Sequence, residues 1–413
     1  MRPPAKARRT LAIAVAVALL VGASGTGSAQ SAPNRAPILV LVSFDGWRWD
    51  YTDRLPATNL RALASRGVRA RALIPSFPVL TFPNHYTIVT GLYPEHHGVV
   101  GNTMTDRSIP ERFTQSSETG KEARWWGGEP VWVTAIRQGL RAFTMFWPGT
   151  EAPIAGVRPT EWRPYDKTVP NAERVTQALT WLALSDAERP SFVSLYFEEV
   201  DTAGHDFGIG SRELTAAARH LDQALGLLVA GIRRLGLADR TTIVVVSDHG
   251  MTRLSRQRII LLDDLIDPAA VDVTEWGGTL SLTPRDGDVE AAYRRLRGKH
   301  PRLAIYKRDE VPAHLHYRSH ARIPPIIGVP DAGWTVTTRR RLAETGLSAG
   351  AHGYDTKTPA MGALFVAAGP ALRRGLVVAP FENIHVYNLL CAILKLTPAP
   401  NDGDPAVVRG FLR

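Results

Sequence analysis

The sequence predicts an α/β fold: a mostly parallel central sheet with helices on both faces and a small cap or insert subdomain. Three observations lead to this prediction. Strand-like and helix-like segments alternate along most of the 413 residues. Residues 36–44 and 241–247 are short runs rich in Val, Ile and Leu, as expected for parallel strands buried on both faces. Residues 252–345 break the alternation with shorter strands and frequent Pro and Arg, which indicates an insert.

The first 29 residues have the composition of an export signal. Four basic residues precede the apolar stretch 11–21, and Gly27-Ser28-Ala29 marks a cleavage site. The apolar stretch is too short to span a bilayer. We therefore expect residues 1–29 to be a signal peptide and residues 30–413 to be the catalytic domain. The mature chain would have no membrane span, and would be periplasmic or secreted in a bacterium.

The charge balance favours small anionic ligands. Removing residues 1–29 takes away four basic and no acidic residues, which lowers the formal net charge from +10 to +6. The chain has no run of Lys and Arg that would track a nucleic-acid backbone, so no nucleic-acid polymer is expected as a partner. Cys391 is the single cysteine and lies in an apolar segment, where a buried structural thiol is expected. Nothing in the sequence indicates the oligomeric state.

The remaining elements follow from apolar periodicity and turn residues. Strands are expected at residues 68–74, 143–147, 191–200 and 364–368, and helices at residues 58–66, 171–184, 211–235 and 383–396.

A further helix is expected to have Pro83 in its first turn, because proline is favoured there. Thr81 and Phe82 would then lie at or just before the N-cap. A threonine at this place is more often an ordinary cap than a nucleophile. The same helix start also offers free N–H groups and partial positive charge, which suit a phosphate.

Aspartates and histidines follow the strongest strands or lie in nearby loops. In open α/β sheets, ligand sites form beyond the carboxyl ends of the strands, so these side chains should converge. They are Asp45, Asp201, Asp248, His205, His249 and His352. Asp45, Asp201, His205 and His352 alone are each more often turn, cap or loop residues or accidental, and Asp248-His249-Gly250 after a Val-rich strand is more specific. Their joint occurrence at one sheet edge is what favours a site.

The chemistry that fits these six residues is metal binding. Three clustered carboxylates would repel one another without a cation. Carboxylate and imidazole are ligands that suit zinc, and a catalytic zinc takes about three protein ligands and keeps an open position. Six residues therefore suffice for two Zn²⁺ ions. Two metals roughly 4 Å apart can clamp the attacking and leaving oxygens of a phosphoryl transfer, and a threonine needs such activation to be a nucleophile.

These residues lie in segments that resemble the nucleotide pyrophosphatase/phosphodiesterase family of the alkaline phosphatase superfamily, in its compact bacterial form. The similar segments run in order along residues 37–402 and include Phe44-Asp45-Gly46, Thr81-Phe82-Pro83-Asn84-His85-Tyr86, Asp201-Thr202-Ala203-Gly204-His205, Ser247-Asp248-His249-Gly250 and His352-Gly353-Tyr354-Asp355. The resemblance implies an alkaline phosphatase-like fold. It also implies hydrolysis of small nucleotide substrates, both phosphodiesters and nucleoside triphosphates, to nucleoside monophosphates through a covalent threonine intermediate.

The resemblance also implies a role for each site residue. Thr81 would be the nucleophile, and Asn102 would contact a phosphate oxygen together with backbone N–H near Thr81. Phe82 and Tyr165 would sandwich the nucleobase, although either could instead pack in the core. The zinc ligands would be Asp201, His205 and His352 for one ion, and Asp45, Asp248, His249 and the Thr81 oxygen for the other.

Other functions remain open on the same residues. A phospholipid-headgroup phosphodiesterase would hydrolyse lysophospholipid in preference to ATP, and a phosphomonoesterase would prefer a monoester to the matching diester. From a different class, a catalytically silent nucleotide-binding protein would bind nucleotide tightly without zinc.

Overall fold

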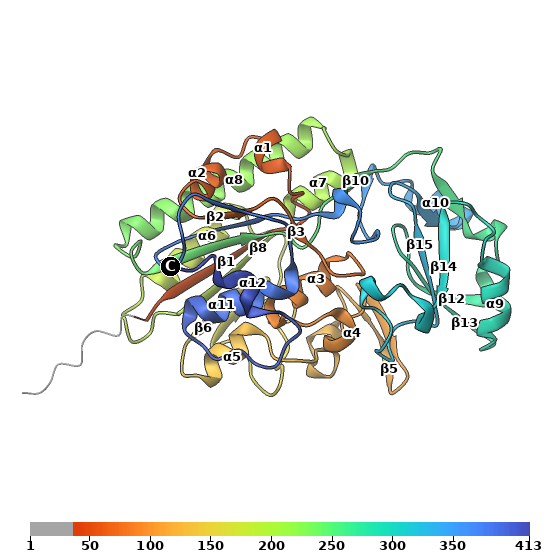
Figure 1. Ribbon diagram of the computed structural model, residues 1–413, viewed down its shortest axis with the longest axis horizontal. Helices are drawn as coiled ribbons and strands as arrows, with labels where there is room; N and C mark the ends of the chain where they lie inside the picture. Colours follow the sequence, from red (N-terminus) through yellow and green to blue (C-terminus); the bar gives the residue numbers. More distant parts are fainter. Residues whose placement is uncertain (1–35) are drawn as a thin grey trace, which may run out of the picture. The chain divides into compact units, whose positions relative to one another are not determined.

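A computed structural model describes residues 36–413, so the predicted signal peptide lies outside the described residues. The central sheet has eight strands in the order β19-β2-β18-β9-β1-β8-β6-β7 (Figure 1). Only β18 runs against its neighbours, so the sheet is mostly parallel, as predicted. The strands are β1 (Ile38–Phe44), β2 (Val68–Ala70), β6 (Ala142–Met145), β7 (Glu161–Arg163), β8 (Phe192–Phe197), β9 (Thr241–Val246), β18 (Phe365–Ala368) and β19 (Leu376–Val378).

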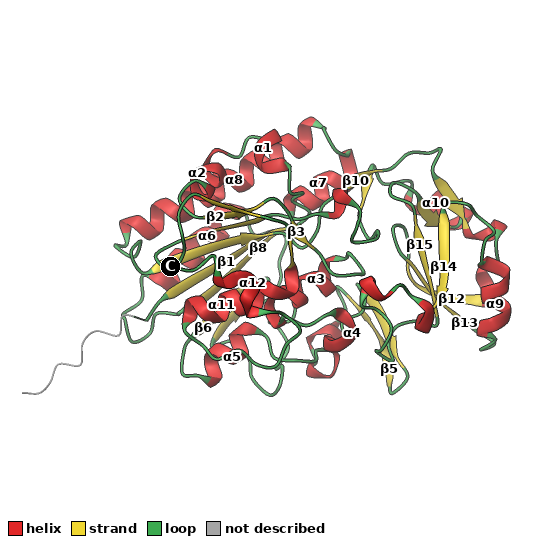
Figure 2. Ribbon diagram, viewed as in Figure 1, coloured by secondary structure: helices red, strands yellow, loops and turns green. Residues whose placement is uncertain are grey.

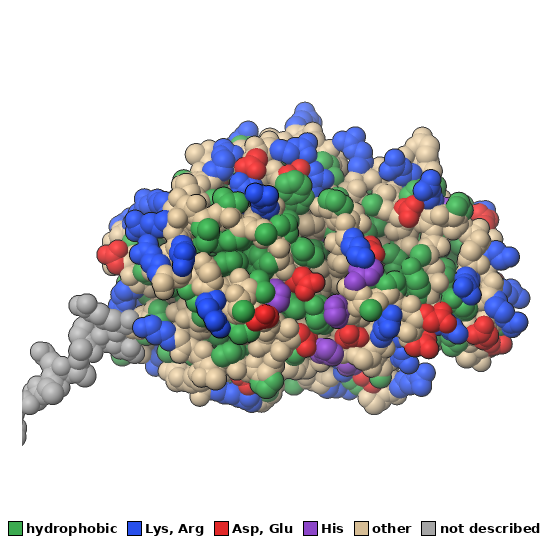
Figure 3. Space-filling view, viewed as in Figure 1, with side chains coloured by type: hydrophobic (Ala, Val, Ile, Leu, Met, Phe, Trp, Pro, Cys, Tyr) green, Lys and Arg blue, Asp and Glu red, His purple; other side chains and the backbone are tan. Residues whose placement is uncertain are grey.

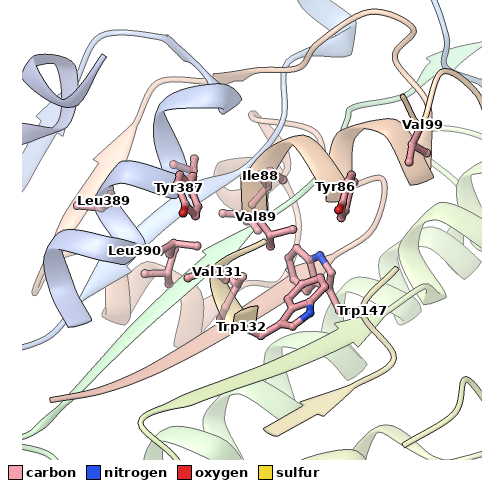
Figure 4. Packing of buried hydrophobic residues seen from close by; sticks show 14 of the residues in the cluster. Tyr86, Ile88, Val89, Val99, Val131, Trp132, Trp147, Tyr387, Leu389 and Leu390 are labelled. Carbon is pink, nitrogen blue, oxygen red and sulfur yellow. The ribbon is translucent and has the colours of Figure 1, made fainter. Parts of the chain in front are cut away.

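Helices cover both faces of this sheet (Figure 2). All seven residues of β1 are buried. Because side chains alternate along a strand, Leu39 and Leu41 enter one core while Val40 and Val42 enter the other. The first core holds α3 (Thr81–Thr90), α5 (Val131–Arg137) and α11 (Val386–Leu394), whose side chains interlock in Figure 4. The second holds α2 (Thr58–Ala64), α6 (Asn171–Leu182) and α8 (Arg212–Arg234).

Local sequence explains the best-defined of these helices. Ser211 caps α8 by accepting the N–H of Leu214, and apolar residues at helical spacing face the core. In α11, Cys391 is fully buried as predicted, and burial raises the pKa of its thiol to about 12. No helix within residues 36–413 is long and apolar enough to cross a membrane.

A second sheet forms within the predicted insert. It has four antiparallel strands in the order β12-β13-β15-β14, namely β12 (Val271–Glu275), β13 (Leu280–Pro284), β14 (Leu303–Lys307) and β15 (Ile326–Pro330). Together with α9 (Val289–Leu296) it encloses a separate apolar core. Beside it, β11 (Ile259–Leu261) pairs with β16 (Thr335–Thr337), and α10 (Arg339–Thr345) follows β16.

Shorter elements complete the described chain. They are α1 (Tyr51–Arg54), α4 (Pro94–His97), α7 (Glu199–Phe207), α12 (Pro405–Arg409), and the strand pairs β3 (Leu73–Ile74) with β20 (Phe381–Glu382), β4 (Thr103–Asp106) with β5 (Ile109–Thr114), and β10 (Thr252–Arg253) with β17 (Gly350–Ala351).

Two predicted boundaries are wrong near the site. The strand predicted to reach Val200 ends at Phe197, and Asp201 lies in the first turn of α7. Acidic residues favour a helix N-terminus, and Glu198 and Glu199 supply them here. The N-cap of α3 is Leu80, so Thr81 is the first helical residue rather than the cap.

Charge is mixed over the face shown in Figure 3. Lys and Arg side chains are scattered there among acidic ones and form no continuous basic stripe on that face.

Candidate active site

The structure brings the six predicted ligand residues together in two groups. Asp45, Asp248 and His249 form one group, because β1 and β9 are parallel neighbours and these residues follow their carboxyl ends. Asp201, His205 and His352 form the other, with the first two one turn apart on α7 and the third just after β17. Within each group the possible ligand atoms all lie within 4.8 Å of one another.

Each group contains buried carboxylate oxygens that the protein does not satisfy. Asp45 Oδ1, Asp201 Oδ1 and Asp248 Oδ2 have no hydrogen-bond donor among residues 36–413. Burial, and then the charge of another aspartate of the site, raises the pKa of each carboxyl well above its usual range. Leaving buried carboxylates unpaired is costly. A divalent cation in each group would remove this cost, so the residues fit two metal ions.

The three histidines present the nitrogen that a metal needs. Nδ1 of His205 lies 2.9 Å from the carbonyl of Gly350, that of His249 lies 3.0 Å from the carbonyl of Gly250, and that of His352 lies 2.8 Å from the carbonyl of Val79. A carbonyl can only accept, so each Nδ1 must carry the proton. The Nε2 lone pairs then face the aspartates.

Burial keeps these imidazoles neutral. It lowers the pKa of His249 well below the usual value and that of His352 to about 3. Their Nε2 atoms lie 3.0 Å from Asp248 Oδ2 and 4.0 Å from Asp201 Oδ1, respectively. The site therefore offers neutral imidazole nitrogen beside aspartate oxygen, the donor set that suits zinc.

Supporting contacts around the site were absent from the sequence prediction. The Tyr196 hydroxyl donates to Asp45 Oδ2 at 2.6 Å, and the Gly46 N–H donates to Asp248 Oδ1 at 3.2 Å. Gly46 has a φ of +68°, and a Cβ there would lie 2.8 Å from the Cα of Asp201, which explains the glycine of Asp-Gly. The partners are 151 and 202 residues apart, respectively, so no local pattern could reveal them.

Thr81 lies at the edge of the first group. Its side chain is buried, and its Oγ1 is 3.5 Å from His249 Nε2. Because Leu80 is the N-cap, the Thr81 hydroxyl is not used for capping. The hydroxyl is therefore available for chemistry at the start of a ten-residue helix, where partial positive charge favours anions.

Asn102 approaches the same helix start with a fixed orientation. Its Oδ1 accepts the N–H of Phe82 at 2.9 Å, which leaves its Nδ2 as the free donor. The prediction that backbone N–H near Thr81 assists Asn102 needs refinement, because the Phe82 N–H is already used. Pro83 has no N–H, and Asn84 donates within the first turn, so the Thr81 N–H is the donor that remains.

Phe82 and Tyr165 line one cavity of about 510 Å³ that also reaches Asp45, Asp201 and Thr81. Phe82 packs edge-on against Phe113, with ring centroids 5.7 Å apart. Tyr165 is 46% exposed. The cavity therefore has one aromatic wall held by the core and one that is open to solvent, and both adjoin the candidate metal groups.

Comparisons with known proteins agree with this geometry. The model of the family described as type I phosphodiesterase / nucleotide pyrophosphatase matches residues 39–355. The chain is 38% identical to the venom phosphodiesterase CdcPDE of Crotalus durissus collilineatus over 91% of this chain and 46% of the relative. It is 35% identical to the human ectonucleotide pyrophosphatase/phosphodiesterase family member 7 over 100% of this chain and 90% of that protein.

Solved structures give the same result. Murine ectonucleotide pyrophosphatase / phosphodiesterase 5, in an inactive form in complex with AMP, has a TM-score of 0.87 and 33% identity to this chain. The match covers 92% of this chain and 100% of that one. The chain spans about half the length of the venom relative, but nearly the full length of this structural neighbour.

Proposed function

The chain belongs to the type I phosphodiesterase / nucleotide pyrophosphatase family, and from this premise we propose that it hydrolyses nucleotide phosphodiesters and nucleoside triphosphates to nucleoside monophosphates. One observation carries the proposal. The hydroxyl of Thr81 does not cap α3 and lies at the start of that helix. Beside it are two groups of Asp and His residues, whose buried carboxylate oxygens lack donors in the described chain. The printed names of the relatives and the AMP complex of the structural neighbour support it.

We assign a zinc ion to each group of ligands. Asp201, His205 and His352 would hold one, while Asp45, Asp248 and His249, together with the Thr81 oxygen, would hold the other. Three oxygen and nitrogen ligands with an open position are typical of catalytic zinc. When bound, the ions lower the pKa of a coordinated hydroxyl and offset negative charge on the oxygens around phosphorus.

The chain's own residues carry out the individual steps of the reaction. Thr81 Oγ1 forms a bond to phosphorus, its proton passes to solvent, and the bond between phosphorus and the leaving oxygen breaks. Asn102 Nδ2 and the Thr81 N–H donate to a non-bridging oxygen as its charge grows. Water then cleaves the threonine ester, which releases the nucleoside monophosphate and restores the hydroxyl.

The aromatic cavity would hold the nucleoside. Its volume of about 510 Å³ and its walls Phe82 and Tyr165 suit a stacked base. Stacking on aromatic side chains is worth about 1–3 kcal/mol per base and suits every base. Replacement of Tyr165 by alanine should therefore raise KM for a nucleotide about tenfold, whereas phenylalanine should preserve it. Equal KM values for the alanine and phenylalanine variants would remove Tyr165 from the base site.

We further propose that the protein is exported, with residues 1–29 removed and residues 30–413 forming the catalytic domain in the periplasm or outside the cell. The export-type composition of the first residues supports this proposal. The relatives named as venom and ecto-enzymes support it as well. Mass spectrometry of the protein recovered from a periplasmic fraction would give the mature N-terminus.

The central test is the replacement of Thr81 by alanine. We expect turnover of a p-nitrophenyl ester of a nucleoside monophosphate to fall to background, while elemental analysis still finds two zinc ions per chain. Thr81→Ser retains a hydroxyl and should keep measurable turnover, which makes it the matched control. Wild-type rates in the alanine variant would refute the assignment of the nucleophile.

The same assay separates the remaining functions. We expect ATP and dinucleotides to be hydrolysed faster than lysophospholipid, and the diester faster than its matching monoester. The reverse preference in either pair would replace the proposed activity with a phospholipid-headgroup phosphodiesterase or a phosphomonoesterase.

A further inference from the structure

A second cavity opens onto the Asp201, His205 and His352 group. It has a volume of about 280 Å³ and is lined by Asn102, by both of these histidines, and by residues of β16 and α10. Among the described residues, it shares no lining residue with the aromatic cavity, which contains Asp45, Asp201 and Thr81. The two cavities are thus lined by different residues of the candidate site.

Arg341 supplies the single Lys or Arg side chain among the described residues that line the second cavity. Its guanidinium lies over the ring of Trp276, 5.7 Å from the centroid, and no acidic side chain of residues 36–413 forms an ion pair with it. Its neighbours differ, because Arg339 pairs with Asp264 and Arg340 pairs with Glu344. Of these three consecutive arginines, only Arg341 lacks an ion pair within residues 36–413, although its charge acts on Glu275 in the same cavity.

Two threonines of β16 line the same cavity. Thr335 and Thr337 are 6% and 8% exposed, and neither side chain forms a hydrogen bond with any residue of the described range. They are two apart on β16, so they face the same side of the strand. Beside them, a Cβ added at Gly277 would meet only Thr335 Oγ1, at 3.8 Å, so this wall is open. Their hydroxyls can therefore donate to an acceptor-rich ligand in the cavity.

One acidic side chain, Glu275, also lines the described part of this cavity. Its Oε1 accepts the N–H of Thr103 at 2.8 Å. Burial raises the pKa of this carboxyl to about 7, and the positive charge of Arg341 acts against this rise. A backbone donor already holds Glu275, and Arg341 supplies the positive charge of the cavity lining.

We propose that the second cavity binds the phosphates of the leaving group, namely the pyrophosphate end of a nucleoside triphosphate, with Arg341 as the charged contact. This inference rests on the proposed function. In a displacement at phosphorus, the attacking and leaving oxygens lie roughly in line on opposite sides. Thr81 attacks from beside His249, so the leaving oxygen departs on the side of the other group, whose two histidines line this cavity.

The charge balance of the step favours this placement. The bond between the α-phosphorus and the bridging oxygen breaks, and its electron pair leaves with pyrophosphate, which gains one negative charge. The Arg341 guanidinium offsets this charge, and the hydroxyls of Thr335 and Thr337 donate to the phosphate oxygens. An uncharged aryl leaving group offers no such oxygens, so it would gain far less from the cavity.

The first test compares two substrates in matched variants. The ratio of kcat/KM for ATP to kcat/KM for a p-nitrophenyl ester of AMP should fall about tenfold in Arg341→Ala, as expected for the loss of one charge-assisted hydrogen bond. Arg340→Ala removes the same charge from the same helix but lies outside the cavity, so the ratio should stay at the wild-type value. Arg341→Lys should recover part of the loss. An unchanged ratio in Arg341→Ala would overturn the proposal.

A binding measurement tests the site without turnover. In a Thr81→Ala background, calorimetry should give a Kd for ATP about tenfold weaker after Arg341→Ala, while the Kd for AMP stays the same. Replacing Thr335 and Thr337 together by valine, which keeps the shape but removes the hydroxyls, should weaken ATP several-fold and spare AMP. Equal losses for ATP and AMP would refute a leaving-group site.

The two measurements separate this inference from the proposed function. Absence of aryl ester hydrolysis by the wild-type enzyme would refute the function, and the binding comparison would still decide the role of Arg341. Normal aryl ester hydrolysis, together with a Kd for ATP that Arg341→Ala does not change, would refute the leaving-group site alone.

Discussion

Replacement of Asn102 by alanine should slow the reaction without unfolding the protein. Its Oδ1 accepts the Phe82 N–H at 2.9 Å, which leaves Nδ2 as a free donor. Loss of one such donor to a developing oxyanion typically lowers kcat about 10²–10³-fold, or about 2.7–4 kcal/mol. The alanine variant also loses one neutral hydrogen bond, worth about 1 kcal/mol. For a domain of this size that loss lowers Tm by only about 2 °C.

An aspartate at the same position separates donation from positioning. Asn102→Asp keeps an oxygen that accepts the Phe82 N–H but replaces the donor with a second oxygen. We therefore expect the aspartate variant to melt near the wild-type temperature while its kcat stays as low as that of the alanine variant, or lower.

The assay is kcat on a p-nitrophenyl ester of a nucleoside monophosphate at saturating substrate, with zinc content and thermal unfolding measured in parallel. Recovery of kcat in the aspartate variant would show that Asn102 only holds the helix start. A loss below about tenfold in the alanine variant, with zinc retained, would refute the donor role outright.

Two further outcomes concern stability. Arg174 is buried and pairs with Glu198 at 2.7 and 2.9 Å, so Arg174→Met should cost about 3–5 kcal/mol in denaturant unfolding. Arg212→Met, which breaks an ion pair whose arginine is 94% exposed, should leave the unfolding midpoint close to the wild-type value, and similar losses for both variants would contradict this reasoning. Removing the metals with a chelator should lower Tm, and the Tm of the metal-free protein should fall further as pH rises through the raised pKa values of the site carboxyls. The pKa values of the three site carboxyls are raised in the folded chain, so above about pH 4 that chain binds more protons than the unfolded one, and its stability is lost as pH rises through the raised values. The site histidines, whose pKa values are lowered, affect the pH dependence of stability only below about pH 6.5. Asp45→Asn, which keeps an acceptor for Tyr196, should raise the Tm of the metal-free protein at high pH, and a lower Tm would contradict the electrostatic account.

Sequence reasoning predicted that the six candidate ligand residues converge, which the structure shows, but it placed one of them on the wrong element. Asp45 and Asp248 lie where the prediction had them, since both directly follow strands whose apolar runs are unambiguous. Asp201 was expected after a strand and lies on α7, because Val200 is buried in a helix rather than in the sheet. Apolar residues next to a strand cannot by themselves distinguish these two environments.

The start of α3 shows that sequence reasoning is also limited in placing a single residue. Pro83 correctly indicated a helix near Thr81, but proline is tolerated throughout the first turn, so the pattern could not separate the cap from the first helical residue. That difference of one position decides whether the threonine hydroxyl caps the helix or stays free.

The sequence by itself determined which residues can meet. Aspartates after parallel strands share one edge of the sheet because every such strand ends there, and Asp201 and His205 share a helix face because they are four apart. Only the tertiary structure decided how they meet. The carbonyl of Val79 orients His352 across 273 residues, Tyr196 reaches Asp45 across 151, and the Arg341 guanidinium lies over the ring of Trp276. These contacts depend on the packing of elements distant in the chain, and that packing sets the atom-to-atom distances on which the chemistry rests.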